Sequence, residues 1–513
     1  MPCISIIRWK MVLTSVIYIA FLIGLLILYY IVPGKIQWLL LLIASIIFIG
    51  FSINNPLVIL LIIYGIVVTY FGAIFIEKQP NEKKKNRIKV VTILLILLEL
   101  IALKYLSFIG MLLSNIGIHL NEESVKNISM LAPLGISFYS LISIGYVLDV
   151  ARGVAKSQRN ILKHALFILY FPQITSGPIT RYSEMKESLF EKHKLDFHNI
   201  YFGFQRILWG LFKKLVISER VAIIVNTVFD NYSEYSGLYI VVATFAFAIQ
   251  LYTDFSGCMD IVLGTSEMFG IVLPENFDTP FFSKSISEYW RRWHISLGNW
   301  FKDYYFYPIL KSDFIQNMQK KLKPKVGKKW SKKIPTYFGM LILWTTIGLW
   351  HGGNYTYLIG SGLLHWFYIV FGEICSPVFK KIANFFRLKD DSIVLKFVQI
   401  VRTFILVCIG FVFFRSSTVT QAMKMLASIP SLDLKVKIFE IGLEREEVVV
   451  AVISILLLFT ISLLKQKINV REFIHKRNIV FRYAVWIVLV ASILVFGYYG
   501  VGYDSQAFIY QRF

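Results

Sequence analysis

The chain consists largely of apolar runs of about twenty residues, the length that an α-helix needs to cross the hydrocarbon core of a bilayer. Windows of this kind begin near Met11, Gln37, Asn55, Lys89, Ile128, Tyr201, Gly237, Pro335, Tyr355, Phe397, Glu447 and Phe481. They predict about eleven to thirteen transmembrane helices. Shorter apolar pieces at 161–176 and 259–273 are interrupted by Pro, Gly or polar residues. These pieces are typical of re-entrant or half-helices that line a protein interior.

Composition supports the same class, because 56% of the 513 residues are hydrophobic and only 17% are charged. A soluble globular domain carries about 25% charged residues. No long polar segment separates two apolar blocks, so we expect one all-α polytopic membrane domain over 1–513. Its core motifs lie in 128–375, and further helices follow in 397–513. No small-residue cleavage site follows the first apolar run, so we expect that run to be retained rather than removed as a signal peptide.

The net charge of +23 is concentrated in short connections between apolar runs, at 78–89, 311–333 and 465–477. Cytoplasmic loops of membrane proteins carry such an excess of Lys and Arg. The pattern therefore predicts contact with membrane lipid at the cytoplasmic side of a cell membrane, and it argues against nucleic-acid binding.

The segment 285–297 sets ionisable groups among aromatic residues. On an α-helix, four of its residues share one face: Trp290, Trp293, His294 and Leu297. Glu288 and Arg291 are three residues apart and are expected to pair. An amphipathic helix that dips into the membrane fits this pattern, and so does a simple interfacial anchor.

His351 ends the apolar run 340–350 and precedes two glycines, Gly352 and Gly353, which let the backbone approach another helix or a ligand closely. A neutral imidazole in such a place can accept a proton, which makes His351 a candidate general base. The alternative is a histidine that only hydrogen-bonds between helices. His365 is expected to be of this second kind, the remaining histidines are expected in loops or near helix ends, and no spacing supports a metal site.

Two further segments place polar groups within apolar surroundings, 252–260 and 173–182. Both are interpreted as broken helices around a cavity. Asp254 and Asp260 are expected to orient a histidine or to pair with an arginine, because an uncompensated buried carboxylate costs too much free energy. The candidate arginines are Arg181, Arg291 and Arg292.

Together these motifs resemble the membrane-bound O-acyltransferase superfamily, and within it the bacterial branch of alginate O-acetylation, peptidoglycan O-acetylation and teichoic acid D-alanylation membrane proteins. The matching pieces are APLGISFY at 132–139, SGPITRY at 176–182, DFSG at 254–257, the segment 276–300, and GLWHG at 348–352. The resemblance implies a ring of tilted helices around a central funnel, where a cytoplasmic acyl donor meets an acceptor.

By the same resemblance, His351 matches the family's general base and His294 matches its second histidine, which assists. Candidate lining residues of the funnel are Arg181, Asp254, Arg291, Arg292, Trp293 and Trp350. The carboxyl end resembles an aromatic terminal motif in which a tyrosine relays the acyl group, and Tyr510 matches that tyrosine. Gln511 and Arg512 depart from the motif, and an interfacial aromatic anchor is the alternative.

The resemblance favours transfer of acetyl from acetyl-CoA, with no bound cofactor, to an extracytoplasmic polysaccharide, assisted by a separate hydrolase-like transferase outside the membrane. Teichoic acid D-alanylation with an acyl carrier protein thioester is the alternative within the family. From the residues alone, a transporter or a flippase for lipid-linked glycans also suits broken helices with buried charges. Replacement of His351 by Ala separates these classes. An acyltransferase should lose acyl transfer while it remains folded and inserted, whereas a transporter need show no such dependence.

Overall fold

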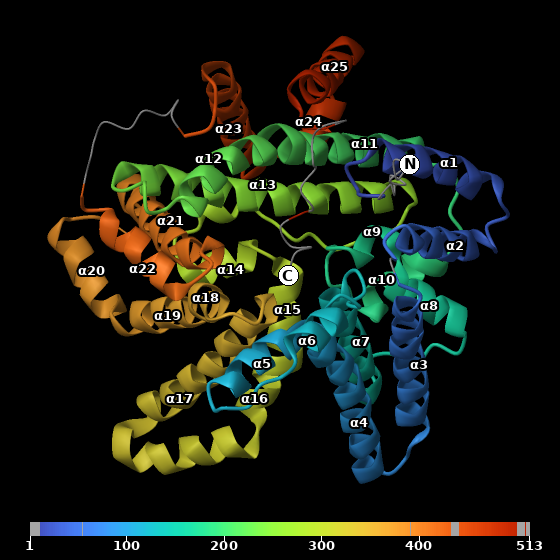
Figure 1. The fold of residues 1–513 in the computed structure, drawn as a ribbon, viewed down its shortest axis with the longest axis horizontal. Helices are drawn as coiled ribbons and strands as arrows, with labels where there is room; N and C mark the ends of the chain where they lie inside the picture. Colours follow the sequence, from blue (N-terminus) through green and yellow to red (C-terminus); the bar gives the residue numbers. More distant parts are fainter. Residues whose placement is uncertain (1–10, 54, 390, 432–440, 500–507, 509–513) are drawn as a thin grey trace. The chain divides into compact units, whose positions relative to one another are not determined.

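The structure is a computed structural model that describes residues 11–53, 55–389, 391–431, 441–499 and 508. These residues are mostly helical, and an isolated antiparallel bridge joins Phe277 to Trp293 (Figure 1). The predicted all-α class of a polytopic membrane protein is therefore confirmed. The chain divides into two compact units, and each is described by itself.

The first unit comprises the described residues of Met1–Leu211, Gly257–Pro274 and Ser505–Arg512. Its helices are α1 (Val16–Ile31), α2 (Gln37–Gly50), α3 (Leu57–Lys78), α4 (Glu82–Leu100), η1 (Ile101–Tyr105), α5 (Leu106–Ser114), α6 (Glu122–Ser129), α7 (Ile136–Ala151), α8 (Ile161–Leu169), α9 (Phe171–Ile174), α10 (Tyr182–Phe190), α11 (Phe197–Leu211) and the second half of α13 (Leu238–Met268).

The second unit comprises the described residues of Phe212–Ser256 and Glu275–Asp504. Besides the first half of α13, its helices are η2 (Phe212–Ser218), α12 (Glu219–Asp230), η3 (Pro280–Phe282), α14 (Ile286–Arg292), α15 (Ile295–Phe301), η4 (Lys302–Phe306), α16 (Tyr307–Lys311), α17 (Asp313–His351), α18 (Tyr355–Tyr357), η5 (Leu358–Leu363), α19 (Leu364–Ile374), α20 (Ser376–Phe385), α21 (Ile393–Arg415), α22 (Val419–Ser428), α23 (Arg445–Lys465), α24 (Val470–His475) and α25 (Ile479–Phe496).

Seven helices of the described chain are long and apolar enough to cross a membrane. They are Leu57–Lys78, Glu82–Ser114, Leu238–Met268, Tyr355–Ile374, Ile393–Arg415, Arg445–Lys465 and Ile479–Phe496. The expected windows near Met11, Gln37 and Ile128 correspond to the shorter apolar helices α1, α2 and α7. Their side chains contribute to the interior of the first unit.

One of the two predicted broken helices is confirmed and the other is wrong. Helix α8 ends at Leu169, the short α9 ends at Ile174, and residues 175–181 are not helical. In contrast, α13 runs without interruption through 252–260. Its polar residues do not break the helix because they are satisfied there: the Thr253 hydroxyl donates back to the carbonyl of Ile249, and Asp254 has a basic partner.

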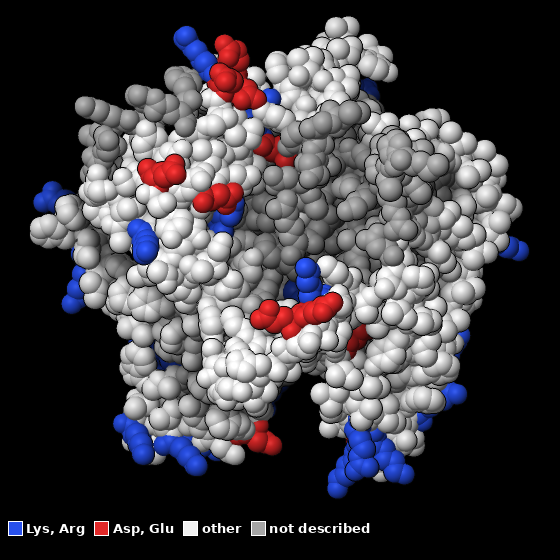
Figure 2. Space-filling model, viewed as in Figure 1, with Lys and Arg blue, Asp and Glu red and all other residues white. Residues whose placement is uncertain are grey.

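The basic connection at 311–333 is a helical hairpin within α17. Gly327 has a left-handed backbone (φ 76°), and the chain turns back there (Figure 1). The turn carries eight lysines between 320 and 333 and no acid. Figure 2 shows basic side chains at this turn and at the α3–α4 connection. The returning arm of the hairpin continues into the apolar segment that ends at His351.

Candidate active site

His351 is the last residue of α17, and its imidazole is buried. The ring centroid lies 5.1 Å from that of Trp350 and 5.6 Å from that of Phe414, which belongs to α21. The motif singled out in the sequence therefore places a histidine inside the second unit, among aromatic rings that exclude water.

Two glycines allow α17 to bring His351 there. A Cβ added to Gly348 would lie 2.9 Å from the Leu358 Cα atom, so α17 touches the backbone of η5 at this point. A Cβ added to Gly352 would lie 2.6 Å from the ring of Tyr357. Both distances are shorter than real Cβ contacts. Gly352 thus confirms the close approach predicted directly after His351, and Gly348 adds a second one that the sequence analysis did not predict.

His294 does not lie within a continuous helix, and the prediction that residues 290–297 form one helical face is wrong. Helix α14 ends at Arg292, and His294 has a left-handed backbone (φ 47°, ψ 52°) before α15 begins. The reason is pairing with a distant segment: Trp293 bridges to Phe277, and the Ile295 amide donates to the Asn276 carbonyl at 3.1 Å. Such a conformation is costly for a residue with a Cβ, and it is often found at functional sites.

Asn276 determines the tautomer of His294. Its Oδ1 atom accepts hydrogen bonds from the Ser296 amide at 3.0 Å and the Ser296 hydroxyl at 2.9 Å, which identifies that atom as the oxygen. His294 Nδ1 lies 3.3 Å from the same oxygen and must therefore be the donor. The lone pair of the imidazole consequently resides on Nε2. In the sequence, Asn276 is only the first residue of the matching segment 276–300, and no local signal indicates this role.

The two histidines meet at Trp350. The ring of Trp350 lies 6.0 Å from that of His294 as well as next to His351. Burial lowers the pKa of His294 well below its usual 6.5, and the neighbouring His351 lowers it further. His294 is therefore a neutral imidazole near pH 7, as acceptance of a proton or a hydrogen bond requires.

Trp293 packs inside an aromatic cluster beside this pair. Its ring lies 5.0 Å from Phe277 in an edge-to-face arrangement and 5.5 Å from Tyr289 in a stacked one. Phe255 of α13 contacts both Phe277, at 5.0 Å, and the His294 ring, at 4.8 Å. Phe255 was not singled out as a candidate, because a phenylalanine in an apolar run gives no signal of its own.

Two of the three candidate arginines form ion pairs, and the third is exposed. Arg292 pairs with Glu288 at 2.8 Å, whereas Arg291 is exposed, so the predicted pair of Glu288 with Arg291 is wrong. One turn of helix separates Glu288 from Arg292, and the end of α14 at Arg292 favours that spacing. Arg181 belongs to the first unit and pairs with Glu184 at 3.7 Å. Tyr510 lies outside the described residues.

The two α13 carboxylates have basic partners that the sequence did not predict. Asp254 lies 2.5 Å from Lys214 Nζ in the second unit, and Asp260 lies 2.9 Å from Arg206 Nε in the first. The expectation that each carboxylate needs a cation is thus confirmed. The expected cations were arginines from other motifs, and the lysine and arginine found here occupy an apolar stretch that looked like ordinary membrane helix.

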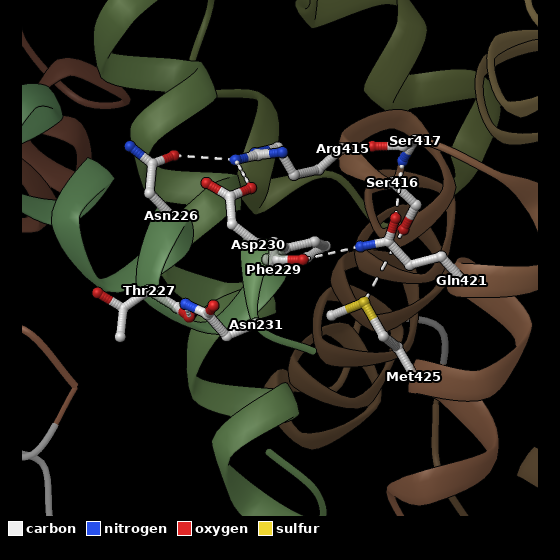
Figure 3. Close-up of polar contacts among 10 residues, drawn as sticks. All are labelled: Asn226, Thr227, Phe229, Asp230, Asn231, Arg415, Ser416, Ser417, Gln421 and Met425. Atoms are coloured by element: carbon white, nitrogen blue, oxygen red, sulfur yellow. Dashed lines mark hydrogen bonds and ion pairs between the residues drawn. The ribbon is translucent and has the colours of Figure 1, made fainter. Parts of the chain in front are cut away.

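A polar corner between α12 and α21–α22 supports the His351 side of the site (Figure 3). Arg415 donates to Asn226 at 2.9 Å and pairs with Asp230 at 2.8 Å, and Gln421 donates to the Phe229 carbonyl at 2.8 Å. Phe414, which precedes Arg415 in α21, contacts both His351 and Tyr357, and its ring lies 5.0 Å from that of Tyr357. The corner therefore holds one wall of the His351 environment.

Four of the eight histidines are buried: His164, His294, His351 and His365. His365 packs between Trp290, at 5.0 Å, and Trp344, at 5.6 Å, in keeping with the packing role expected for it. His164 lies in the first turn of the short helix α8, near a helix end as expected, and its ring is 5.0 Å from that of Tyr146.

Comparison with known proteins identifies the family. A sequence model of the membrane-bound O-acyltransferase family (MBOAT) matches residues 121–320. The teichoic acid D-alanyltransferase of Bacillus subtilis is 31% identical over 294 residues, which cover 56% of this chain and 69% of that protein. The chain belongs to the membrane-bound O-acyltransferase family.

Other similar MBOAT proteins are named for different activities. The probable alginate O-acetylase AlgI of Pseudomonas syringae is 33% identical over 58% of this chain and 51% of its own length. The peptidoglycan O-acetyltransferase of Helicobacter pylori is 28% identical over 73% of this chain and 70% of its own length. The chain thus spans about half the length of the alginate relative. The MBOAT match includes Asp254, Asn276 and His294 and ends before His351.

Proposed function

We propose that this protein transfers an acyl group, in the first place acetyl, from a cytoplasmic thioester across a bacterial cell membrane for O-acetylation of an extracytoplasmic polysaccharide. The observation that carries the proposal is the pair of buried imidazoles, His294 and His351, that share contact with Trp350. Membership of the MBOAT family supports the reaction class, and two of the relatives named above are O-acetylating proteins.

In the proposed reaction His351 is the general base. It takes the proton of an attacking hydroxyl while the oxygen bonds to the thioester carbonyl carbon. The C–S bond then breaks, and the His351 imidazolium returns the proton to the leaving thiolate. His294 assists through Nε2, which accepts a hydrogen bond from the thiol or hydroxyl group being positioned. The rings of Phe255 and Trp350 both pack edge-to-face with the His294 imidazole and so restrict its orientation. Positioning of this kind contributes to the rate because it replaces a chance encounter by a fixed geometry.

Acetyl-CoA is the favoured donor, and a hydrolase-like transferase outside the membrane is the favoured partner that completes transfer to the glycan. Tyr510 is proposed to relay the acyl group. The second candidate is D-alanyl transfer to teichoic acid from an acyl carrier protein thioester, favoured by the 69% coverage of the Bacillus subtilis relative.

The test compares envelope glycans from cells that carry the wild-type protein, the His351→Ala variant or no copy, with membrane levels measured by immunoblot. Mass spectrometry and proton NMR quantify ester-linked groups. Loss of O-acetyl in both deficient strains supports the favoured function, and loss of ester-linked D-alanine supports the second. Unchanged esters at normal protein levels would contradict both and favour transport.

A further inference from the structure

Three consecutive residues of α13 connect a buried charge cluster to the site. Asp254 and Ser256 contact two successive lysines of η2: Lys214 Nζ lies 2.5 Å from Asp254 Oδ1, and Lys213 Nζ donates to Ser256 Oγ at 2.9 Å. The residue between them, Phe255, contacts the His294 ring instead, at 4.8 Å. All of these residues belong to the second unit.

Lys214 is the centre of the cluster. Its side chain is 4% exposed and lies 2.5 Å from each of two carboxylates, Asp254 and Glu219, whose side chains are 1% and 3% exposed. A charge buried to this degree must keep its partners, because water cannot replace them. A rotation or shift of α13 would separate Asp254 from Lys214, so the cluster fixes the helix in position.

The local structure of η2 presents the two lysines to α13. The segment Phe212–Ser218 is a π-helix, with a wider turn than an α-helix, and all seven of its residues are buried. Short π-helical segments occur often at functional sites. A buried pair of lysines costs stability, and a packing role alone would be filled better by apolar side chains of similar volume.

We propose that Lys214 is a positioning residue that holds Phe255 against His294 and thereby keeps the imidazole in its productive orientation. The inference rests on the acyl-transfer function proposed above. Lys214 touches no reacting atom in this scheme. Its effect passes through Asp254 to the backbone of α13, and from there to the ring of Phe255.

The test uses a neutral set of variants, because Lys214→Met alone would leave two buried carboxylates without a cation. The triple variant K214M/D254N/E219Q removes every charge of the cluster at once. We expect it to insert and fold, with kcat for acyl transfer about a hundredfold lower, the loss typical of a displacement near 1 Å. KM should change by less than about threefold, because substrate binding is not the altered step.

A double-mutant cycle separates positioning from general damage. F255L with the cluster intact should lower kcat to a similar extent, and F255L added to the triple variant should cause little further loss, since both act through one contact. The matched control is R206M/D260N, which removes the other ion pair of α13 without touching the residues around His294. Its kcat should stay within about twofold of wild type.

A second readout does not depend on turnover. Diethyl pyrocarbonate modifies accessible neutral imidazoles, and mass spectrometry reports modification of each histidine. Modification of His294 should become several-fold faster in the triple variant and in F255L, and should be unchanged in R206M/D260N. Wild-type kcat and unchanged His294 modification in a folded triple variant would overturn the inference, as would additive losses in the cycle. A wild-type protein without acyl transfer would contradict the proposed function instead, and the modification rates would still decide the role of Lys214.

Discussion

At the residue scale, the orientation of His294 depends on one amide oxygen. Asn276 Oδ1 accepts from His294 Nδ1 and from both donors of Ser296, so a single side chain joins the imidazole to the first turn of α15. The left-handed backbone at His294 stores strain that these bonds must offset. Loss of the amide should therefore release the imidazole rather than unfold the protein.

We expect Asn276→Ala to lower acyl-transfer kcat at least about tenfold, because His294 loses the partner that fixes its tautomer. The unfolding free energy should fall by about 1–3 kcal/mol, the cost of leaving buried donors unpaired. The measurements are steady-state kinetics and denaturation in mixed micelles. Asn299→Ala, at an exposed position of α15, is the control and should change neither quantity appreciably. Wild-type turnover in Asn276→Ala would show that Asn276 does not orient the histidine.

Burial of His294 also predicts a pH dependence of stability. Since the folded-state pKa lies far below 6.5, the unfolded chain binds a proton below that pH and the folded protein does not. Stability should therefore decrease as the pH falls through about 6.5, the usual pKa of an exposed histidine. His294→Gln should remove that component. Equal pH slopes for wild type and variant would contradict a buried neutral His294.

At the element scale, a close backbone contact determines how the end of α17 packs against η5. Gly348 lies against the backbone of η5, which cannot move aside as a flexible side chain can. Gly348→Ala should therefore cost about 1–3 kcal/mol of stability and reduce turnover, since the displaced helix carries His351. A suitable control is Gly372→Ala on α19, where a Cβ would meet nothing within 4 Å. Thermal unfolding and kinetics of both variants check the prediction, which fails if the two alanines behave alike.

In the polar corner between α12 and α21–α22, two polar contacts can be ranked by their expected contribution to stability (Figure 3). Arg415 and Asp230 have side chains 25% and 59% exposed, so Arg415→Gln should cost no more than about 1 kcal/mol. Gln421 is buried and satisfies the Phe229 carbonyl and the Ser417 amide, at 2.8 and 3.0 Å. Gln421→Leu should cost about 1–3 kcal/mol, because both backbone groups lose a buried partner. Unfolding measurements test the order, and a greater loss in Arg415→Gln would reverse it.

At the scale of the whole molecule, charge distribution predicts membrane topology. The lysines at the α3–α4 connection and at the turn of the α17 hairpin should each face the cytoplasm. In a background without native cysteines, Cys substituted for Lys84 or for Lys329 should react with a membrane-impermeant maleimide only in inside-out vesicles or opened cells. Labelling of either position in intact cells would contradict the prediction for that loop.

The membrane class, most helices and the place of His351 at the end of an apolar helix could be predicted from the sequence, because these features depend on local properties. Apolar length follows from bilayer thickness, and backbone hydrogen bonds within a helix join residues four apart. The motif at 348–352 contains Gly348, His351 and Gly352 within five residues, so a close approach of the backbone near this histidine could be predicted from local sequence. The broken chain near Pro172 and Gly177 was predictable for the same local reason.

Only the tertiary structure decided how the site is assembled. Lys214 and Asp254 are 40 residues apart in the chain, and Asn276 and Ser296 are 20 apart. A single sequence does not show which residues at such separations lie close together in space. Helix packing determines which charged side chains come within contact distance in the interior of a folded unit. Asp254 therefore pairs with Lys214, which comes from an apparently apolar segment. His294 leaves the helical pattern because pairing with residues 276–277 outweighs local helix propensity. Sequence by itself thus determined the class and the acid–base candidates, and long-range packing determined their orientation.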